Sequence, residues 1–151
     1  MKEPEKREFL DRVGRLLASQ GVGALATDYR HTPHQSLIAY ICSEDLREIF
    51  FITPTYTRKV AAMEENPHVA LLVDNRRNLA SDFDACVAVT AKGRAETLSE
   101  SARRAFLSRY LERHPYLEEF SASPSCSFYH ILVESYTLVS SFQRVEVLPL
   151  R

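Results

Sequence analysis

Glycine is scarce in this 151-residue chain, with only 4 residues. This count leaves no Gly-rich phosphate loop and no Gly-x-Gly-x-x-Gly motif, so neither a P-loop nor a dinucleotide-binding fold is predicted. Cysteine is scarce as well: its 3 residues are odd in number, widely spaced and without a Cys-x-x-Cys pair. We therefore expect neither a disulfide framework nor a cysteine-bound zinc ion. The cysteines are Cys42, Cys86 and Cys126.

The chain also lacks an excess of charge of either sign, with 19 Lys and Arg residues against 20 Asp and Glu residues. A balanced charge predicts no polyanionic partner, so we expect no nucleic-acid binding. Residues 69–73 form one of the longest apolar runs, which is far too short to cross a bilayer. The N-terminal residues lack the apolar core of a signal peptide. We therefore expect a cytoplasmic protein with no membrane partner.

What the sequence does contain is the composition of an ordinary folded domain, with 45% hydrophobic and 26% charged residues. Its length fits one domain, which we predict to span residues 1–151. No internal repeat, linker or low-complexity segment divides the chain.

Three segments carry the signals of helices. Residues 5–20 have apolar side chains at steps of three and four, which predict one buried helical face. A short helix over 58–65 ends at Asn66 and Pro67, because proline cannot continue it. A third helix is predicted over 99–113, with Ser99 as its N-cap. The two apolar stripes are Phe9, Leu10, Val13, Leu16 and Leu17, and Ala102, Ala105, Phe106, Tyr110 and Leu111.

The rest of the chain predicts short strands in meander order. Turn-forming residues at 28–33 and 74–78 separate some of them. Residues 49–53 are apolar at consecutive positions, which indicates a strand buried on both faces. The predicted strands cover residues 24–27, 36–41, 49–53, 69–73, 87–96, 128–133 and 136–142, with a candidate tail strand at 145–148. This order favours a mainly β fold, a six-stranded antiparallel barrel with an N-terminal helix and flanking helices.

One stretch carries recognisable chemistry. A buried strand ends in the hydroxyl of Thr53, and Thr57, Arg58 and Lys59 follow at a helix start. The first turn of a helix has free N–H donors and a positive dipole, and arginine and lysine bind phosphate oxygens. These residues therefore predict an anion-binding cradle. The alternative is an ordinary helix cap at Thr57 with two solvated charges beside it.

Residues 49–73, IFFITPTYTRKVAAMEENPHVALLV, resemble the flavin-binding split β-barrels related to pyridoxamine 5′-phosphate oxidase. The shared pattern is an apolar strand ending in Thr, a Ser/Thr-Arg-Lys segment, a short helix, Asn-Pro, and a second apolar strand. Two further segments, 36–40 and the Gly-Arg-Ala-Glu of 93–96, are similar to strands of the same family.

The resemblance implies a split barrel that forms a homodimer, with flavin mononucleotide (FMN) in a groove at the dimer interface. The phosphate is then expected at Thr53, Thr57, Arg58 and Lys59. The flavin ring is expected beside the backbone of the strand that contains Ser36, Leu37, Ile38 and Ala39. Such a protein is an FMN-dependent oxidoreductase acting on a small-molecule redox partner, and because the flavin carries the electrons, no catalytic side chain is named. A non-catalytic carrier or sensor of flavin or haem is one alternative, and a barrel that has lost its cofactor and acts through its dimer surface is another.

The sequence also departs from this family. The Arg-x-His pair that binds substrate in the true oxidase is absent from residues 144–151, so we do not expect pyridoxamine phosphate oxidation. Ala88 stands where relatives often have glutamine. Asn75 and Arg76 are candidates for contact with the flavin or a substrate, but a solvated loop with an Asx-type bond is the favoured alternative. Phe142 is a weaker candidate for the site.

The five histidines do not predict a metal site. A metal ion needs three or four converging ligands, and these histidines are dispersed along the chain. A haem-degrading branch of the same fold uses a histidine as its iron ligand, but no histidine here matches that position, so haem is only a secondary alternative. The histidines are His31, His34, His68, His114 and His130.

Overall fold

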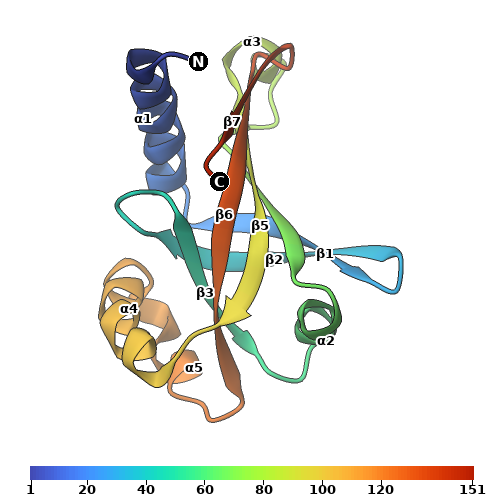
Figure 1. The fold of residues 1–151 in the computed structure, drawn as a ribbon, viewed down its shortest axis with the longest axis vertical. Helices are drawn as coiled ribbons and strands as arrows, with labels where there is room; N and C mark the ends of the chain where they lie inside the picture. Colours follow the sequence, from blue (N-terminus) through green and yellow to red (C-terminus); the bar gives the residue numbers. More distant parts are fainter.

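A closed antiparallel barrel forms the centre of the computed structural model, which describes residues 1–151 (Figure 1). The sheet order is β3-β2-β1-β4-β5-β6-β7, and a further pairing of β3 with β6 closes the first six strands into a barrel. The seventh strand adds to the free side of β6. The strands are β1 Val22–Tyr29, β2 Thr32–Cys42, β3 Glu48–Pro54, β4 His68–Asp74, β5 Val87–Thr97, β6 Cys126–Ser140 and β7 Arg144–Pro149. The predicted six-stranded antiparallel barrel is confirmed.

Helices flank the barrel at several points (Figure 1). Helix α1 lies beside the upper half of the sheet, α4 and α5 lie at the lower left, and α2 lies at the lower right. Helix α3 sits at the top, next to the β6–β7 hairpin. The helices are α1 Glu3–Ser19, α2 Arg58–Glu65, α3 Asp82–Ala85, α4 Glu100–Arg113, the 3₁₀ turn η1 Pro115–Leu117 and α5 Glu118–Ser121. None of them is both long and apolar enough to cross a membrane.

The core joins α1 to the inside of the barrel. Four residues of the predicted α1 stripe, Phe9, Val13, Leu16 and Leu17, are buried in a cluster of 23 core residues. Burying each such side chain contributes about 1.5–3 kcal/mol, so this face fixes α1 against the sheet. As predicted from its continuous apolar run, β3 is buried from Ile49 to Thr53.

A second cluster explains the burial of the outer side of β3. The outward residues Phe50 and Ile52 pack against Phe106 and Tyr110 of α4. Helix α4 begins as predicted, because the Ser99 hydroxyl accepts a hydrogen bond from the Ala102 amide at 3.3 Å. Ala105, which we expected in the apolar stripe, is exposed.

Two strand boundaries were predicted wrongly. The separate strands at 128–133 and 136–142 are one strand, β6. A register shift opposite Lys92 and Gly93 leaves Glu134 as an extra residue, so the polar Glu134-Ser135 pair forms a bulge instead of a turn. The turn at 28–33 is also shorter than expected. Arg30 and His31 alone form it, with φ angles of 52° and 66° that suit a tight hairpin, and both strands continue into the predicted turn.

Candidate functional site

The turn between β3 and α2 brings together the polar side chains predicted to form the cradle. Thr53 lies at the end of β3 and is buried. Thr57 caps α2: its hydroxyl accepts a hydrogen bond from the Val60 amide at 3.4 Å and donates one to the Pro54 carbonyl at 3.1 Å. The interpretation of Thr57 as the N-cap of α2 is therefore confirmed. The cap fixes the orientation of the first turn of the helix. The amides of Arg58 and Lys59 in that turn have no intrahelical acceptor.

The two cations of the cradle differ in their surroundings. Lys59 is partly buried, and its ammonium group donates a hydrogen bond to the Thr53 hydroxyl at 3.1 Å. This burial lowers the pKa of Lys59, because it removes water from around the ammonium group. Arg58 is exposed and forms no ion pair or hydrogen bond through its side chain. Together these donors suit a phosphate. They are the Lys59 ammonium, which is bound to Thr53, the free Arg58 guanidinium and the backbone amides at the start of α2.

The strand β2 supplies a second feature, a backbone edge without a strand partner. Antiparallel pairing joins β2 to β3 only at Tyr40, Ile41 and Cys42. The Tyr40 amide donates to the Gly21 carbonyl on the β1 side, and hydrogen-bonding direction alternates along an antiparallel strand. The backbone groups of Leu37 therefore point away from β1, toward the split between β2 and β3.

The predicted residues of β2 thus fall into two groups. Ser36 and Ile38 direct their backbone groups to β1, whereas Leu37 and Ala39 direct theirs to the split. The side chain of Leu37 is 75% exposed, and that of Ile38 is buried in the barrel. The split edge is therefore presented by Leu37 and Ala39, with Ile38 anchoring the strand between them.

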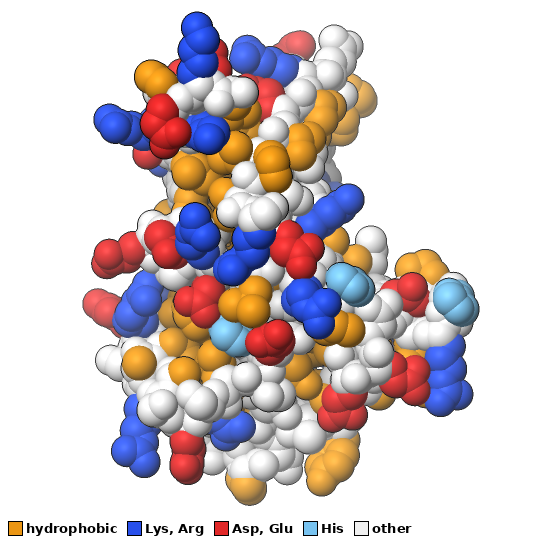
Figure 2. Space-filling model, in the orientation of Figure 1, with side chains coloured by type: hydrophobic (Ala, Val, Ile, Leu, Met, Phe, Trp, Pro, Cys, Tyr) orange, Lys and Arg blue, Asp and Glu red, His pale blue; other side chains and the backbone are white.

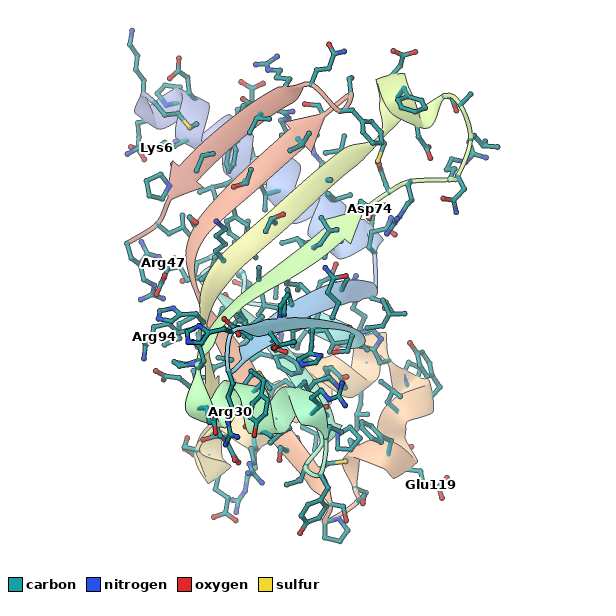
Figure 3. The ribbon with its side chains drawn as sticks, turned by 90° about the vertical axis from the view of Figure 1, so that its right-hand side faces the viewer. Lys6, Arg30, Arg47, Asp74, Arg94 and Glu119 are labelled. Atoms are coloured by element: carbon teal, nitrogen blue, oxygen red, sulfur yellow. The ribbon has the colours of Figure 1, made fainter.

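The structure does not bring Asn75 and Arg76 to this cradle within one chain. They follow the far end of β4, a strand about 20 Å long at 3.3 Å per residue. In Figure 3, Asp74 marks that end of the strand, away from α2. The Asn75 side chain accepts a hydrogen bond from the Val87 amide at 2.7 Å, and Arg76 pairs with Asp74 at 3.0 Å. In the single chain, both side chains bind within their own loop.

The remaining sequence candidates also lie at this far end. Ala88, near the start of β5, is opposite Asp74. Phe142 is exposed in the β6–β7 turn and packs against Phe83 of α3, with ring centroids 5.1 Å apart. In a single chain, neither residue lies beside the β3–α2 turn.

Sequence reasoning missed one polar contact at the split. The hydroxyl of Tyr110 in α4 donates to the Ala39 carbonyl at 3.1 Å. The helical spacing of Tyr110 identified it only as an apolar core residue, and nothing local to β2 indicates that a helix seventy residues later reaches it. A contact of this kind is visible only in the folded chain.

The cradle is open in the single chain. A groove of about 960 Å³ lies between α1, the β2–β3 hairpin, the last turns of α4 and the C-terminal tail, and a depression of about 340 Å³ lies over β1, β4 and β5. Neither is lined by any residue of the cradle or by Leu37 or Ala39. No group of three or more His, Cys, Asp or Glu side chains is placed to hold a metal ion. Figure 2 shows basic and acidic side chains interspersed over the visible face.

A family model described as pyridoxamine 5′-phosphate oxidase matches residues 9–140. This match covers most of the chain, from α1 to the end of β6. The protein belongs to the pyridoxamine 5′-phosphate oxidase-like split-barrel family. The family includes flavin oxidoreductases and non-catalytic binding proteins. No curated protein matches the sequence.

Solved structures share the fold at low sequence identity. A haem-binding protein from Mycobacterium smegmatis superposes with a TM-score of 0.79 at 17% identity; the match covers 90% of this chain and 56% of that one. General stress protein 26 from Bacillus anthracis str. Sterne gives 0.69 at 19% identity, with 95% and 99% covered. A FAD-binding protein from Mesorhizobium loti gives 0.66 at 19% identity, with 82% and 88% covered. The chain thus spans about half the length of the M. smegmatis protein.

Proposed function

We propose that this protein is a homodimeric FMN-binding oxidoreductase that does not oxidise pyridoxamine phosphate. The observation that carries the proposal is the combination of two features, a cradle of anion-binding donors and a strand edge that no other strand pairs. The family includes flavin oxidoreductases, and a FAD-binding protein and a haem-binding protein share the fold. The cradle and the edge together favour FMN among these ligands.

The phosphate of FMN fits the cradle by charge and by donor count. Arg58 supplies a free guanidinium fork, and Lys59 supplies an ammonium group directed at Thr53. The first-turn amides of α2 add backbone donors, and Thr57 fixes their direction. A single cradle without a nucleotide-binding loop accommodates one phosphate, which favours FMN over a dinucleotide.

The polar rim of the flavin ring fits the split edge of β2. The Leu37 amide and carbonyl and the Ala39 amide face the split, where no strand pairs with them. Backbone groups of this kind require a partner, and a ring with alternating donors and acceptors provides one. When bound, FMN supplies the electron-transfer chemistry, and the protein orients the ring and excludes water from it.

A second copy of the chain is needed to cover the site. Residues paired across neighbouring strands, from β2 through β1, β4, β5 and β6 to β7, have their side chains on the same face of the sheet. In Figure 3 the outer face of these strands is turned toward the viewer, and α1 lies behind the sheet. This face carries the exposed apolar side chains of five residues: Val22, Leu37, Leu72, Val145 and Val147. An apolar patch of this kind marks an interface, and Leu37 makes it continuous with the split edge. We therefore place FMN at a homodimer interface.

The partner subunit also explains the candidates at the far end of β4. In an isologous dimer each surface patch meets its copy, so the loop that follows β4 in one subunit is able to reach the split edge of the other. Asn75, Arg76 and Phe142 are then contributions of the partner to the site. Ala88 lies on the same outer face and brings no polar group to it.

An absorption spectrum tests the proposal. The purified protein is measured before and after addition of excess FMN and desalting, beside the double variant Arg58→Ala with Lys59→Ala. We expect flavin bands that survive desalting in the parent protein and are lost in a variant that remains folded and dimeric. Arg104→Ala is the matched control, because Arg104 is exposed on α4 and has no partner.

The outcomes separate the alternatives. Retention of FMN by the double variant contradicts the assigned cradle. A protein that refuses FMN but takes up haem belongs with the haem binders of this fold. For a flavin-loaded protein, steady oxidation of a reduced nicotinamide supports an enzyme, and its absence with every donor tested supports a carrier or sensor.

A further inference from the structure

The outer face of the sheet has a depression at the point where β1 leaves the barrel. Strand β1 pairs with β4 only from Ala24 to Ala26, but it pairs with β2 as far as Tyr29. The end of β1 and the start of β2 therefore project from the barrel as a hairpin, at the right of Figure 1. The depression of about 340 Å³ lies between this hairpin and the outer face of β4 and β5. It adjoins the exposed apolar side chains of that face, because Ala24 lies between Leu37 and Leu72.

Asp28 brings an unpaired carboxylate to this depression. Side chains alternate along β1, so Leu25 and Thr27 are buried inside the barrel and Asp28 lies on the outer face. The Oδ1 atom of Asp28 is buried and has no hydrogen-bond partner. A buried carboxylate oxygen without a partner is unfavourable, and folded proteins satisfy nearly all such atoms. A donor from outside the single chain is therefore needed.

Lys92 brings a cation to the same depression. It lies on the outer face of β5, opposite Ala70 of β4, and its side chain is exposed. Strand β4 lies between β5 and β1, so the strands that carry Lys92 and Asp28 are about 9–10 Å apart. Lys92 forms no ion pair within one chain, either with Asp28 or with Glu134, which also lines the depression. The depression thus holds a carboxylate and an ammonium group on either side of β4.

A two-fold axis brings these two groups together from different chains. When two copies of one face pack against each other, the axis lies in the plane of the interface and exchanges the positions on its two sides. An axis that crosses the depression above β4 therefore places Lys92 of the partner subunit over Asp28, and it places Asp28 of the partner subunit over Lys92. The face is thus complementary in charge to its own copy, as an isologous interface requires.

We propose that Asp28 and Lys92 form two reciprocal ion pairs across a homodimer interface, with the Lys92 ammonium of each subunit bound to the Asp28 carboxylate of the other. The inference rests on the homodimer of the proposed function but not on FMN. The pair gives the buried oxygen of Asp28 its donor, and the adjoining apolar side chains exclude water from it. It also fixes how the two subunits are placed, because only one position of the axis forms both pairs at once.

Charge reversal followed by mixing of the variants tests the proposal. Asp28→Lys and Lys92→Asp each place like charges at both contacts of their own homodimer. We expect the dissociation constant of each of these homodimers to rise at least about 100-fold, tenfold for each contact. When the two variants are mixed in equal amounts, every contact again joins opposite charges. We expect the mixture to form a heterodimer within about tenfold of the parent affinity, measured by sedimentation velocity and native mass spectrometry.

Mixing distinguishes this pair from an ion pair within one chain. If Asp28 and Lys92 interact within one chain, each variant keeps its like charges in that chain, and no heterodimer forms; this result overturns the inference. Arg94→Asp is the matched control, because Arg94 is exposed on the same face of β5, two residues from Lys92, and does not line the depression. A heterodimer of Asp28→Lys with Arg94→Asp overturns the assignment of Lys92.

A second set of variants tests the pair if a lysine at position 28 prevents folding. We expect Asp28→Asn, Lys92→Met and their combination to weaken the dimer to a similar extent, because either substitution alone already removes the pair. Losses that add in the combined variant overturn the inference. A parent protein that dimerises but binds no FMN contradicts the FMN assignment alone. A parent dimer that neither charge reversal weakens overturns this inference alone, and a monomeric parent protein overturns both.

Discussion

The ammonium group of Lys59 donates a hydrogen bond to the hydroxyl of Thr53 at 3.1 Å, which joins the start of α2 to the end of β3. Both residues come from one seven-residue stretch. The bond directs a partly buried cation toward the cradle, beside the free guanidinium of Arg58. The affinity of this arrangement for a phosphate is the basis of the first prediction.

Lys59→Met is expected to abolish the stabilisation that FMN gives. A ligand present at about 100 times its Kd stabilises the folded state by about 2.7 kcal/mol, and this gain is measured as the difference between urea titrations with and without FMN. In the variant the gain falls to near zero, because the buried cation that faces the phosphate is gone. A variant stabilised as much as the parent protein would contradict the assignment of Lys59.

The pH dependence of the stability of the FMN-free protein tests the burial of Lys59 independently. Burial lowers its folded-state pKa below the ordinary value of 10.5, so the unfolded chain binds more protons between the two values. Stability rises with pH wherever the unfolded state binds more protons. The parent protein is thus expected to gain stability, relative to Lys59→Met, as the pH rises through the lowered pKa toward 10.5. Chemical denaturation at a series of alkaline pH values measures this difference.

Leu37→Glu is expected to dissociate the homodimer and release FMN. The side chain is 75% exposed in one chain and lies on the outer face of the sheet beside the split edge. Two-fold symmetry introduces two carboxylates into the interface, each costing about 1–3 kcal/mol, so the dimer is weakened at least about 30-fold. Sedimentation velocity at micromolar concentration measures the change. Ser108→Glu, exposed on α4, is the control and stays dimeric; equal behaviour of the two variants would place the interface elsewhere.

Two glycines are expected to respond in opposite directions to substitution by alanine. At Gly93 a Cβ atom lies 2.1 Å from the Leu132 carbonyl oxygen, a backbone clash at the bulge of β5 and β6. Gly93→Ala is therefore expected to lose about 3 kcal/mol or more of unfolding free energy, or to fail to fold. At Gly14, inside α1, the nearest atom is the Leu46 Cδ1 at 3.5 Å, an ordinary contact. Gly14→Ala is expected to gain about 0.5–1 kcal/mol by helix propensity, as thermal and urea unfolding will measure.

Asp82 is expected to stabilise the loop before β5 in a pH-dependent manner. Its carboxylate accepts backbone hydrogen bonds from Arg77, Asn78 and Leu79 at 2.8–3.3 Å, and the Arg77 amide contributes most to lowering its pKa below 3.8. A lowered pKa gives stability that is present above the unfolded value and is lost as the pH falls through the folded value. Asp82→Asn therefore lowers the melting temperature at neutral pH, and its difference from the parent protein shrinks below pH 3.8. Asp84→Asn, at an exposed position on the same short helix, is the control and leaves the melting temperature at neutral pH unchanged.

Much of the fold follows from local signals in the sequence. Helix α2 has the predicted bounds, because Thr57 caps its start and Pro67 prevents its continuation. The buried strand β3 was recognisable from its continuous apolar run. In contrast, β6 was predicted as two strands, because the bulge that lets Glu134 stay within one strand depends on pairing with β5.

The candidate site likewise has one part that the sequence shows and one part that only the folded chain shows. One strand–turn–helix unit brings together the cradle residues Thr53, Thr57, Arg58 and Lys59, because they are close in sequence. Their capacity to bind an anion can therefore be recognised from the sequence alone. The split edge of β2 is different, because any strand has backbone donors and acceptors. Only the register of β2 with β3 shows which of them are free.

The sequence by itself determined the three longer helices α1, α2 and α4, most strands and the charged cradle, because capping, periodicity and short-range spacing act over a few residues. The tertiary structure decided where the barrel opens, since that depends on the register of β2 with β3, whose pairing ends at Tyr40 and Phe51. It also decided that Asn75 and Arg76 lie apart from the cradle in one chain, because β4 separates the two regions along its whole length. Contacts between distant segments arise from packing, and no local pattern in the sequence encodes them.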